Sequence, residues 1–229
     1  MILSDPEWQA VLLSLKVSGI AVMGSLPFGI LMAWILVRCR FPGKALLDSL
    51  IHLPLVLPPV VVGYLLLISL GRRGIIGEKL YDWFGFSFAF SWRGAALASA
   101  VIAFPLMVRA IRLALEAVDS RLEQAARTLG AGRWRVFFTI TLPLTLPGVI
   151  VGTVLAFARS LGEFGATITF VSNIPGETRT LPLAMFTLIE TPGAEGAAAR
   201  LCIIAIVLAL ASLLASEWLA RAGRKRMGN

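Results

Sequence analysis

Residues 117–143 read AVDSRLEQAARTLGAGRWRVFFTITLP, a polar segment set between long apolar runs. Ser120 and Glu123 have the spacing of a capping box, so a helix is predicted to begin there. Gly130 is placed to end this helix. Apolar residues recur between these limits at i, i+3, i+4 and i+7, which gives the helix one apolar face made of Leu122, Ala125, Ala126 and Leu129. Because two of them are alanines, another backbone could approach closely. The helix is therefore interpreted as a docking element with its apolar face as the contact surface. The alternative is an ordinary surface helix lying on the membrane or on its own bundle.

The chain on either side of this segment is too apolar for a soluble domain. Of its 229 residues 58% are hydrophobic and 15% are charged, whereas soluble domains have about 45–50% and about 25%. A bilayer core of about 30 Å needs about 20 apolar residues in a helix. The sequence predicts an all-α integral membrane protein with five transmembrane helices in one domain, 8–220, and a short basic tail, 221–229. The predicted spans are about 11–37, 47–71, 92–115, 141–165 and 198–219.

A further apolar run, Leu183–Ile189, lies between Pro182 and Pro192 and is too short to cross. It is predicted to be re-entrant or to lie in the membrane interface.

The basic residues of the chain indicate its topology. The formal net charge of +8 could point to nucleic acid, but this composition cannot cover a water-soluble surface, so no nucleic-acid partner is predicted. With the N-terminus outside, thirteen of the 21 basic residues fall in the inner loops and tail, as the positive-inside rule requires. The start of the chain has no basic n-region, so the first helix is expected to stay in the mature protein.

The fourth predicted span carries polar side chains. Arg159 and Glu163 stand one helical turn apart, at a depth where an unpaired charge costs about 2.5–3.5 kcal/mol, so they are expected to pair. Thr153, Ser160 and Thr167 repeat every seven residues, and a continuous helix would align their hydroxyls beside Glu163. We interpret this stripe as part of a translocation path for an oxyanion held by weak donors. The alternative is that the hydroxyls bond back to their own helix.

Prolines and glycines mark two further positions. Pro58 and Pro59 interrupt the second predicted span, where they either line the path or only kink the helix. Gly148 and Gly152 form a GxxxG pattern, which predicts close packing of the fourth span on a neighbour.

The sequence offers little for catalysis. Two cysteines and one histidine cannot build a disulfide framework or a metal cluster, so no metal site and no catalytic residue are predicted. A G-x-x-x-x-G-K-[ST] loop that would cradle nucleotide phosphates is absent. The chain is predicted not to be an enzyme, and an ATP-driven function would require a partner ATPase.

The polar segment resembles the EAA loop of ABC-importer permeases, whose pattern is E-A-A, three residues, G, nine residues and I-x-L-P. In that family the loop forms a coupling helix that fits a cleft in the ATP-binding subunit. The resemblance assigns this role to Glu123, Gln124, Ala125, Ala126, Leu129, Gly130, Ile140, Leu142 and Pro143. Gln124 departs from the pattern, since it stands where the family has its acidic residue, and Glu123 lies about 100° around the helix.

Three longer stretches resemble the molybdate importer permeases, the ModB family. They are FPGKALLDSLIHLPLVLPPVVVGYLLL (41–67), LEQAARTLGAGRWRVFFTITLP (122–143) and RSLGEFGATITFVSNIPGETRTLP (159–182). The resemblance implies a type I ABC importer fold in a bacterial inner membrane, with a periplasmic N-terminus and a cytoplasmic C-terminus. Many permeases of this superfamily have six spans, and this chain is expected to lack the first, peripheral one.

The same resemblance implies the partners and the activity. Two copies of the chain would assemble in membrane lipid with two ModC-type ABC ATPase subunits, which hold ATP and Mg²⁺, and would receive molybdate from a ModA-type periplasmic binding protein. No cofactor is implied in this chain itself. Molybdate would cross by ATP-driven alternating access. Sulfate, thiosulfate and tungstate stay open as substrates because they are also tetrahedral or nearly tetrahedral anions, and a secondary anion transporter is a further alternative.

Overall fold

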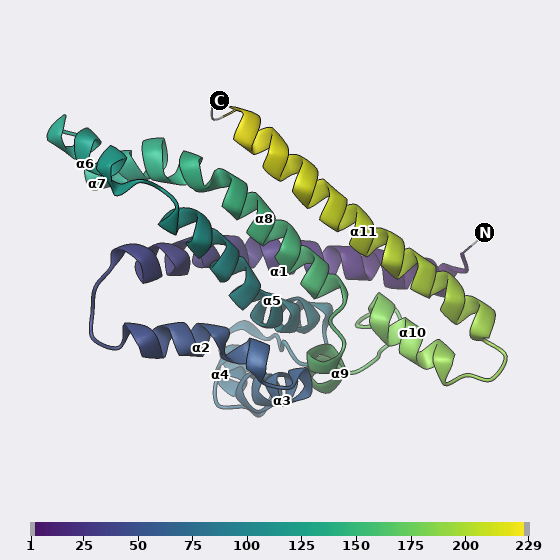
Figure 1. Ribbon diagram of the computed structural model, residues 1–229. Helices are drawn as coiled ribbons and strands as arrows, with labels where there is room; N and C mark the ends of the chain where they lie inside the picture. Colours follow the sequence, from purple (N-terminus) through teal and green to yellow (C-terminus); the bar gives the residue numbers. More distant parts are fainter. Residues whose placement is uncertain (1–2, 227–229) are drawn as a thin grey trace.

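The computed structural model describes residues 3–226, and these residues form helices joined by turns and loops (Figure 1). The helices, in chain order, are α1 (Asp5–Arg38), α2 (Lys44–Val56), α3 (Pro59–Leu70), α4 (Gly77–Phe84), α5 (Trp92–Glu116), α6 (Ser120–Thr128), α7 (Arg133–Val136), the π-helix η1 (Phe137–Thr141), α8 (Leu142–Leu161), α9 (Gly165–Val171), α10 (Leu181–Ile189) and α11 (Glu195–Arg226). The predicted all-α class is confirmed.

Among residues 3–226, four helical stretches are long and apolar enough to cross a membrane: Asp5–Arg38, Trp92–Glu116, Arg133–Leu161 and Glu195–Ala215. The second predicted span is different, because α2 and α3 reach that length only together and are bent by 114° where they meet. Pro58 and Pro59 explain the bend, since proline lacks an N–H and clashes with the preceding turn. The bend agrees with the expectation that Pro58 and Pro59 interrupt the second span, and residues 3–226 contain five spans only if the bent pair counts as one.

The helix α5 packs against both α1 and α8 (Figure 1). Met107 and Ile111 of α5 are fully buried together with Leu36 of α1 and Ala156 of α8. A Cβ added to Gly148 would collide with Ala114 of α5, and one added to Gly152 would lie 3.0 Å from the Met107 carbonyl oxygen. The GxxxG prediction is confirmed, because these glycines let α8 approach α5 closely.

Polar contacts join the first half of α1 to the starts of α10 and α11. Glu7 accepts hydrogen bonds from the backbone N–H and the hydroxyl of Ser4, at 2.7 and 2.9 Å, and pairs with Arg200 of α11 at 2.8 Å. Seven residues further along α1, the buried Ser14 hydroxyl accepts a 2.6 Å bond from the Leu181 N–H at the first turn of α10. The Ser14 contact holds α10, which contains the predicted short apolar segment Leu183–Ile189, against α1, and the Glu7–Arg200 pair holds α11 against α1.

A second close contact joins α3 to α9. A Cβ on Gly63 would lie 2.6 Å from the Ala166 carbonyl oxygen, and a Cβ on Gly165 would lie 2.9 Å from the Pro59 Cβ. Buried apolar residues surround the crossing, including Val62 of α3 and Phe170 of α9. The bent α3 is thus attached to the bundle mainly through α9.

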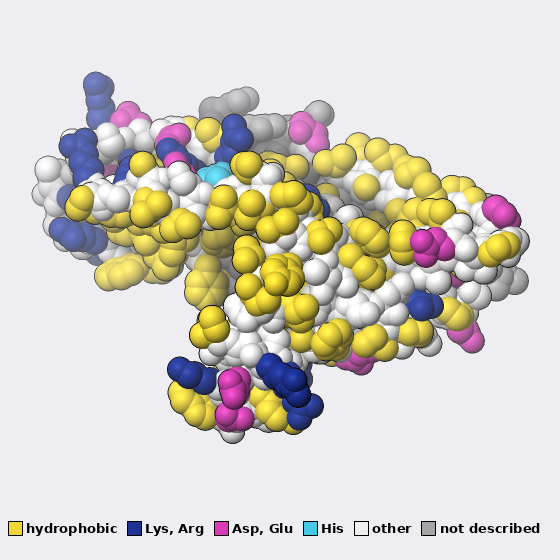
Figure 2. All heavy atoms as spheres, turned by 90° about the horizontal axis from the view of Figure 1, so that it is seen from below, with side chains coloured by type: hydrophobic (Ala, Val, Ile, Leu, Met, Phe, Trp, Pro, Cys, Tyr) yellow, Lys and Arg dark blue, Asp and Glu magenta, His cyan; other side chains and the backbone are white. Residues whose placement is uncertain are grey.

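The surface is largely apolar, as expected for a chain that faces lipid (Figure 2). Lys and Arg side chains gather in that view at the end of the molecule where α6 lies. At this end Arg112 of α5 pairs with Asp48 of α2 at 2.8 Å and with Glu116 at 2.9 Å. This ionic contact fastens α2 to α5.

We expect Gly63→Val to destabilise the protein, because its side chain would be forced into the α9 backbone. Overpacking of this kind costs about 1–3 kcal/mol, which corresponds to a melting temperature lower by roughly 2–12 °C in a chain of this size. The measurement is thermal unfolding of the purified protein in detergent. Gly19→Val is the matched control, since a Cβ there meets no atom within 4 Å. Equal melting temperatures for the two variants would contradict the close contact.

Candidate functional site

The polar segment forms a short helix, α6, at the end of the bundle (Figure 1). The helix begins at Ser120 as predicted, but the predicted capping box does not form. Its N-cap is Asp119, whose carboxylate accepts a 2.9 Å hydrogen bond from the Arg121 N–H. Asp119 does this because its own backbone is extended, the conformation that an N-cap residue adopts.

Glu123 is instead part of a buried ionic contact. Its Oε1 accepts hydrogen bonds of 2.8 Å from the Arg38 guanidinium at the end of α1 and of 2.8 Å from the Thr141 hydroxyl in η1. Glu123 is only 7% exposed. The carboxylate therefore joins α6 to α1 and to the start of the α8 span.

The far end of α6 closes as predicted. Gly130 has φ +85°, and its N–H donates to the Arg127 carbonyl while the Ala131 N–H donates to the Ala126 carbonyl, both at 3.0 Å. This bond pair is a Schellman motif, which requires the left-handed conformation that glycine adopts without strain.

The apolar face of α6 is left open. Leu129 is 89% exposed and Leu122 is 49% exposed, and Ala125 is exposed between them. Gln124 is also exposed, whereas Glu123 is turned into the bundle. The one-residue shift of the acidic position thus has a structural consequence: here the carboxylate is an internal anchor, and the residue presented outward beside the apolar face is an amide.

The second half of the motif forms the beginning of the next span. Ile140 lies in η1, and Leu142 and Pro143 begin α8. Trp134 and Phe138, which the sequence analysis did not select, lie on the same stretch, are 76% and 59% exposed, and stack with ring centroids 6.3 Å apart. Arg38 was also missed as a site residue, because its partner Glu123 is 85 positions away and no local pattern links them.

The expected Arg159–Glu163 pair is present, with 2.8 Å between Arg159 Nη1 and Glu163 Oε2. The Glu163 side chain is 1% exposed and that of Arg159 is 31% exposed. The other carboxylate oxygen of Glu163 accepts a 2.8 Å bond from the Ala166 N–H in the first turn of α9. The buried Glu163 carboxylate therefore contacts both the last turn of α8, through Arg159, and the first turn of α9, through Ala166.

The break between α8 and α9 contradicts the predicted stripe of hydroxyl groups on one continuous helix. The α-helix ends at Leu161 and α9 starts at Gly165, so Thr153, Ser160 and Thr167 do not share one continuous helix. The Thr153 and Thr167 hydroxyls donate to the carbonyls of Val149 and Phe164, at 2.7 and 2.8 Å. Ser160 differs from both, because its hydroxyl is buried without a hydrogen-bond partner among the described residues.

The break in α8–α9 lies beside the break in α2–α3. A Cβ on Gly165 would be 2.9 Å from Pro59 and 3.3 Å from the Val60 nitrogen. Pro59 therefore lies next to the segment that contains Glu163. Irregular backbone within a membrane-spanning region is tolerated where it is buried in protein or lines an aqueous cavity. At the first turn of α3, Pro59 has no N–H and the N–H groups of Val61 and Val62 donate to the Pro58 carbonyl at 2.9 and 3.3 Å, so the Val60 N–H is the donor left for an anion there.

Comparison with known proteins shows what this arrangement is similar to. The family described as "Binding-protein-dependent transport system inner membrane component" matches residues 25–227. The molybdenum transport system permease protein ModB of Escherichia coli (strain K12) is 82% identical over 228 residues, which are 100% of both chains. ModB of Haemophilus influenzae is 65% identical over 97% of both chains.

A sulfate transport system permease protein, CysT of Escherichia coli (strain K12), is 42% identical over 82% of this chain and 66% of its own. Among solved structures, a bacterial alginate ABC transporter has a TM-score of 0.75 at 20% identity, over 96% of this chain and 80% of that chain. That structural likeness concerns the fold alone.

We expect Glu123→Gln to loosen α6, because Arg38 would lose its charged partner. A hydrogen bond to a charged group contributes about 1.5–3 kcal/mol, so amide hydrogen exchange over residues 120–130 should become at least about tenfold faster. Gln124→Ala is the control, since Gln124 is exposed, and should leave the exchange rates unchanged. Unchanged exchange in Glu123→Gln would refute the anchoring role.

Proposed function

The chain belongs to the family of binding-protein-dependent transport system inner membrane components, and we propose that it carries molybdate across the membrane as the permease subunit of an ABC importer. It is a multi-pass membrane protein and a transport subunit, not itself an ATPase. ATP and Mg²⁺ belong to the ATPase subunits that such a permease requires, and a binding protein delivers the substrate. The molybdenum permeases that share 82% and 65% of its sequence over nearly all of both chains support molybdate as the substrate.

The finer assignment of partners rests on the same family. Two copies of the chain pair in a bacterial inner membrane, with two ATPases of the ModC type on one side and a ModA-type binding protein on the other. The N-terminus lies in the periplasm. Both α6 and the C-terminus lie in the cytoplasm. The gathering of Lys and Arg at the α6 end supports this orientation (Figure 2).

The main support for the proposal is the structure of α6. Its apolar face is open, with Leu129 89% exposed, while its Glu123 is bonded to Arg38 and Thr141. An open apolar face is available to the ATPase, and the buried carboxylate transmits its displacement to α1 and α8. The α8 span, about 27 Å from Thr141 to Arg159 at 1.5 Å per residue, then connects α6 with the break at Glu163.

The two adjacent helix breaks form the proposed translocation path. A tetrahedral dianion crosses best through several weak donors, because a strong cationic site would hold it. The Ser160 hydroxyl and the Val60 N–H offer such donors, and Pro58 and Pro59 keep the first turn of α3 apart from α2. Arg159 contributes positive charge that Glu163 offsets at 2.8 Å. Thr153 and Thr167 border the path, but their hydroxyls are already bonded to backbone carbonyls.

We expect Leu129→Asp to release the ATPase from the permease. A charge placed at the centre of an apolar contact costs at least ~2 kcal/mol, or roughly thirtyfold in affinity. The measurement is the amount of ATPase that co-purifies with the tagged permease. Trp83→Asp, on a side chain of α4 that is 76% exposed, is the control and should retain the ATPase. Full retention by Leu129→Asp would overturn the docking role of α6.

We expect Ser160→Ala to reduce molybdate uptake in cells that lack their own permease, by about three- to tenfold, since one unpaired donor is lost. Thr153→Val is the control, because the Thr153 hydroxyl is bonded within α8, and should transport normally at equal expression. Normal uptake by Ser160→Ala would show that Ser160 is not part of the path.

Competition of labelled molybdate with tungstate and sulfate in the same cells distinguishes the alternative substrates, and preferential uptake of sulfate would contradict molybdate as the substrate.

A further inference from the structure

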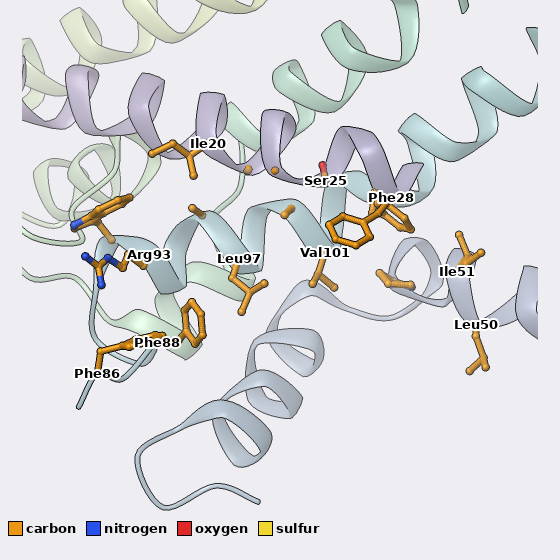
Figure 3. Close-up of a pocket in the computed structure, with 17 residues that line it drawn as sticks. Ile20, Ser25, Phe28, Leu50, Ile51, Phe86, Phe88, Arg93, Leu97 and Val101 are labelled. Carbon is orange, nitrogen blue, oxygen red and sulfur yellow. The ribbon is translucent and has the colours of Figure 1, made fainter. Parts of the chain in front are cut away.

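An apolar groove runs along the outside of the bundle between α1, α2 and α5. Its volume is about 820 Å³, and its walls are almost entirely apolar. Figure 3 shows side chains that line it, from Phe86 and Arg93 at one end, past Leu97 and Val101, to Leu50 and Ile51 at the other. Neither the coupling segment nor the proposed translocation path uses these residues.

The groove has the length of one leaflet of a bilayer. On α5 its lining extends from Trp92 to Phe104, which is about 18 Å at 1.5 Å per residue. Half of a hydrocarbon core of about 30 Å is about 15 Å. A single acyl chain that starts at the interface therefore reaches the end of the groove at the middle of the membrane.

One end of the groove carries positive charge and aromatic rings. Arg93 is exposed and forms no ion pair with another residue between 3 and 226. Its guanidinium lies 5.6 Å from the Trp92 ring and 5.8 Å from the Phe86 ring. Lys16 of α1 lies 3.8 Å from the Trp92 ring. Tryptophan and basic side chains of this kind occupy the headgroup level of a membrane.

We propose that this groove is a binding site for one anionic phospholipid, with an acyl chain lying between α1 and α5 and the phosphate at Arg93. The apolar walls exclude water and polar ligands, so only hydrocarbon fills them favourably. Arg93 supplies a planar guanidinium that matches a phosphate. The lipid fills the space that separates α2 from α1 and so supports α2 where the protein itself does not.

The glycines of α1 provide a direct test. Gly24 lines the groove, and a Cβ added to it meets no atom within 4 Å. A larger side chain at Gly24 should therefore fill the groove without disturbing the fold. Gly19 is equally open but does not line the groove, so Gly19→Leu is a matched control.

The experiment is native mass spectrometry of the permease purified with its ATPase in detergent and then incubated with mixed micelles of phosphatidylglycerol and phosphatidylcholine in equal amounts. The wild type and Gly19→Leu should retain one phospholipid per permease chain, with phosphatidylglycerol preferred. Gly24→Leu should retain at least about tenfold less, because it displaces methylene groups from the groove. Arg93→Gln should lose the preference for phosphatidylglycerol while still retaining lipid.

The proposal is overturned if the wild type retains no phospholipid, or if Gly24→Leu retains as much as Gly19→Leu. It is also overturned if Gly24→Leu dissociates the paired permease chains while no lipid is bound to the wild type, since a second copy would then occupy the groove. None of these results depends on which anion is transported, so a failure of the lipid site is distinguishable from a failure of the proposed function.

Discussion

The arrangement of the bundle depends on the buried carboxylate of Glu163. A membrane provides no water to satisfy a broken helix, so the polar groups at a break must find partners inside the protein. Glu163 supplies them: one oxygen pairs with Arg159 at 2.8 Å, and the other accepts the Ala166 N–H at 2.8 Å. With its first turn held in this way, α9 leaves the direction of α8 and packs against α3, which is itself separated from α2 by Pro58 and Pro59.

A second carboxylate, that of Glu123, has a matching role at the other end of the same span. It connects α6 to Arg38 of α1 and to Thr141 at the start of α8. The α8 span thus has a polar junction at each end, one beside an open docking face and one beside the helix breaks. The glycines of α8 hold it closely against α5, and we propose that a displacement at α6 moves the span as a rigid body. This is the physical basis of the coupling that we propose.

Where a glycine or a proline marks a position, the sequence alone predicted the local structure. Gly130 ends α6, Pro58 and Pro59 break the second span, and Gly148 and Gly152 mark the close packing of α8. The partners of Glu123 could not be predicted, because Arg38 lies 85 positions away and only the fold brings it near. The choice of Asp119 over Ser120 as the N-cap was equally undetermined, since both residue types cap helices well. The end of α8 at Leu161 was missed because no proline marks it, and a tertiary contact between α9 and α3 stabilises the break.

The central claim is that the chain moves molybdate only when an ATPase drives it through α6. The most direct measurement is uptake of labelled molybdate into vesicles that contain the purified permease and its ATPase, with the binding protein supplied outside and ATP enclosed. The account predicts uptake that requires ATP, the ATPase and the binding protein together. Equal uptake by the permease alone, driven by an ion gradient, would contradict it and identify a secondary transporter.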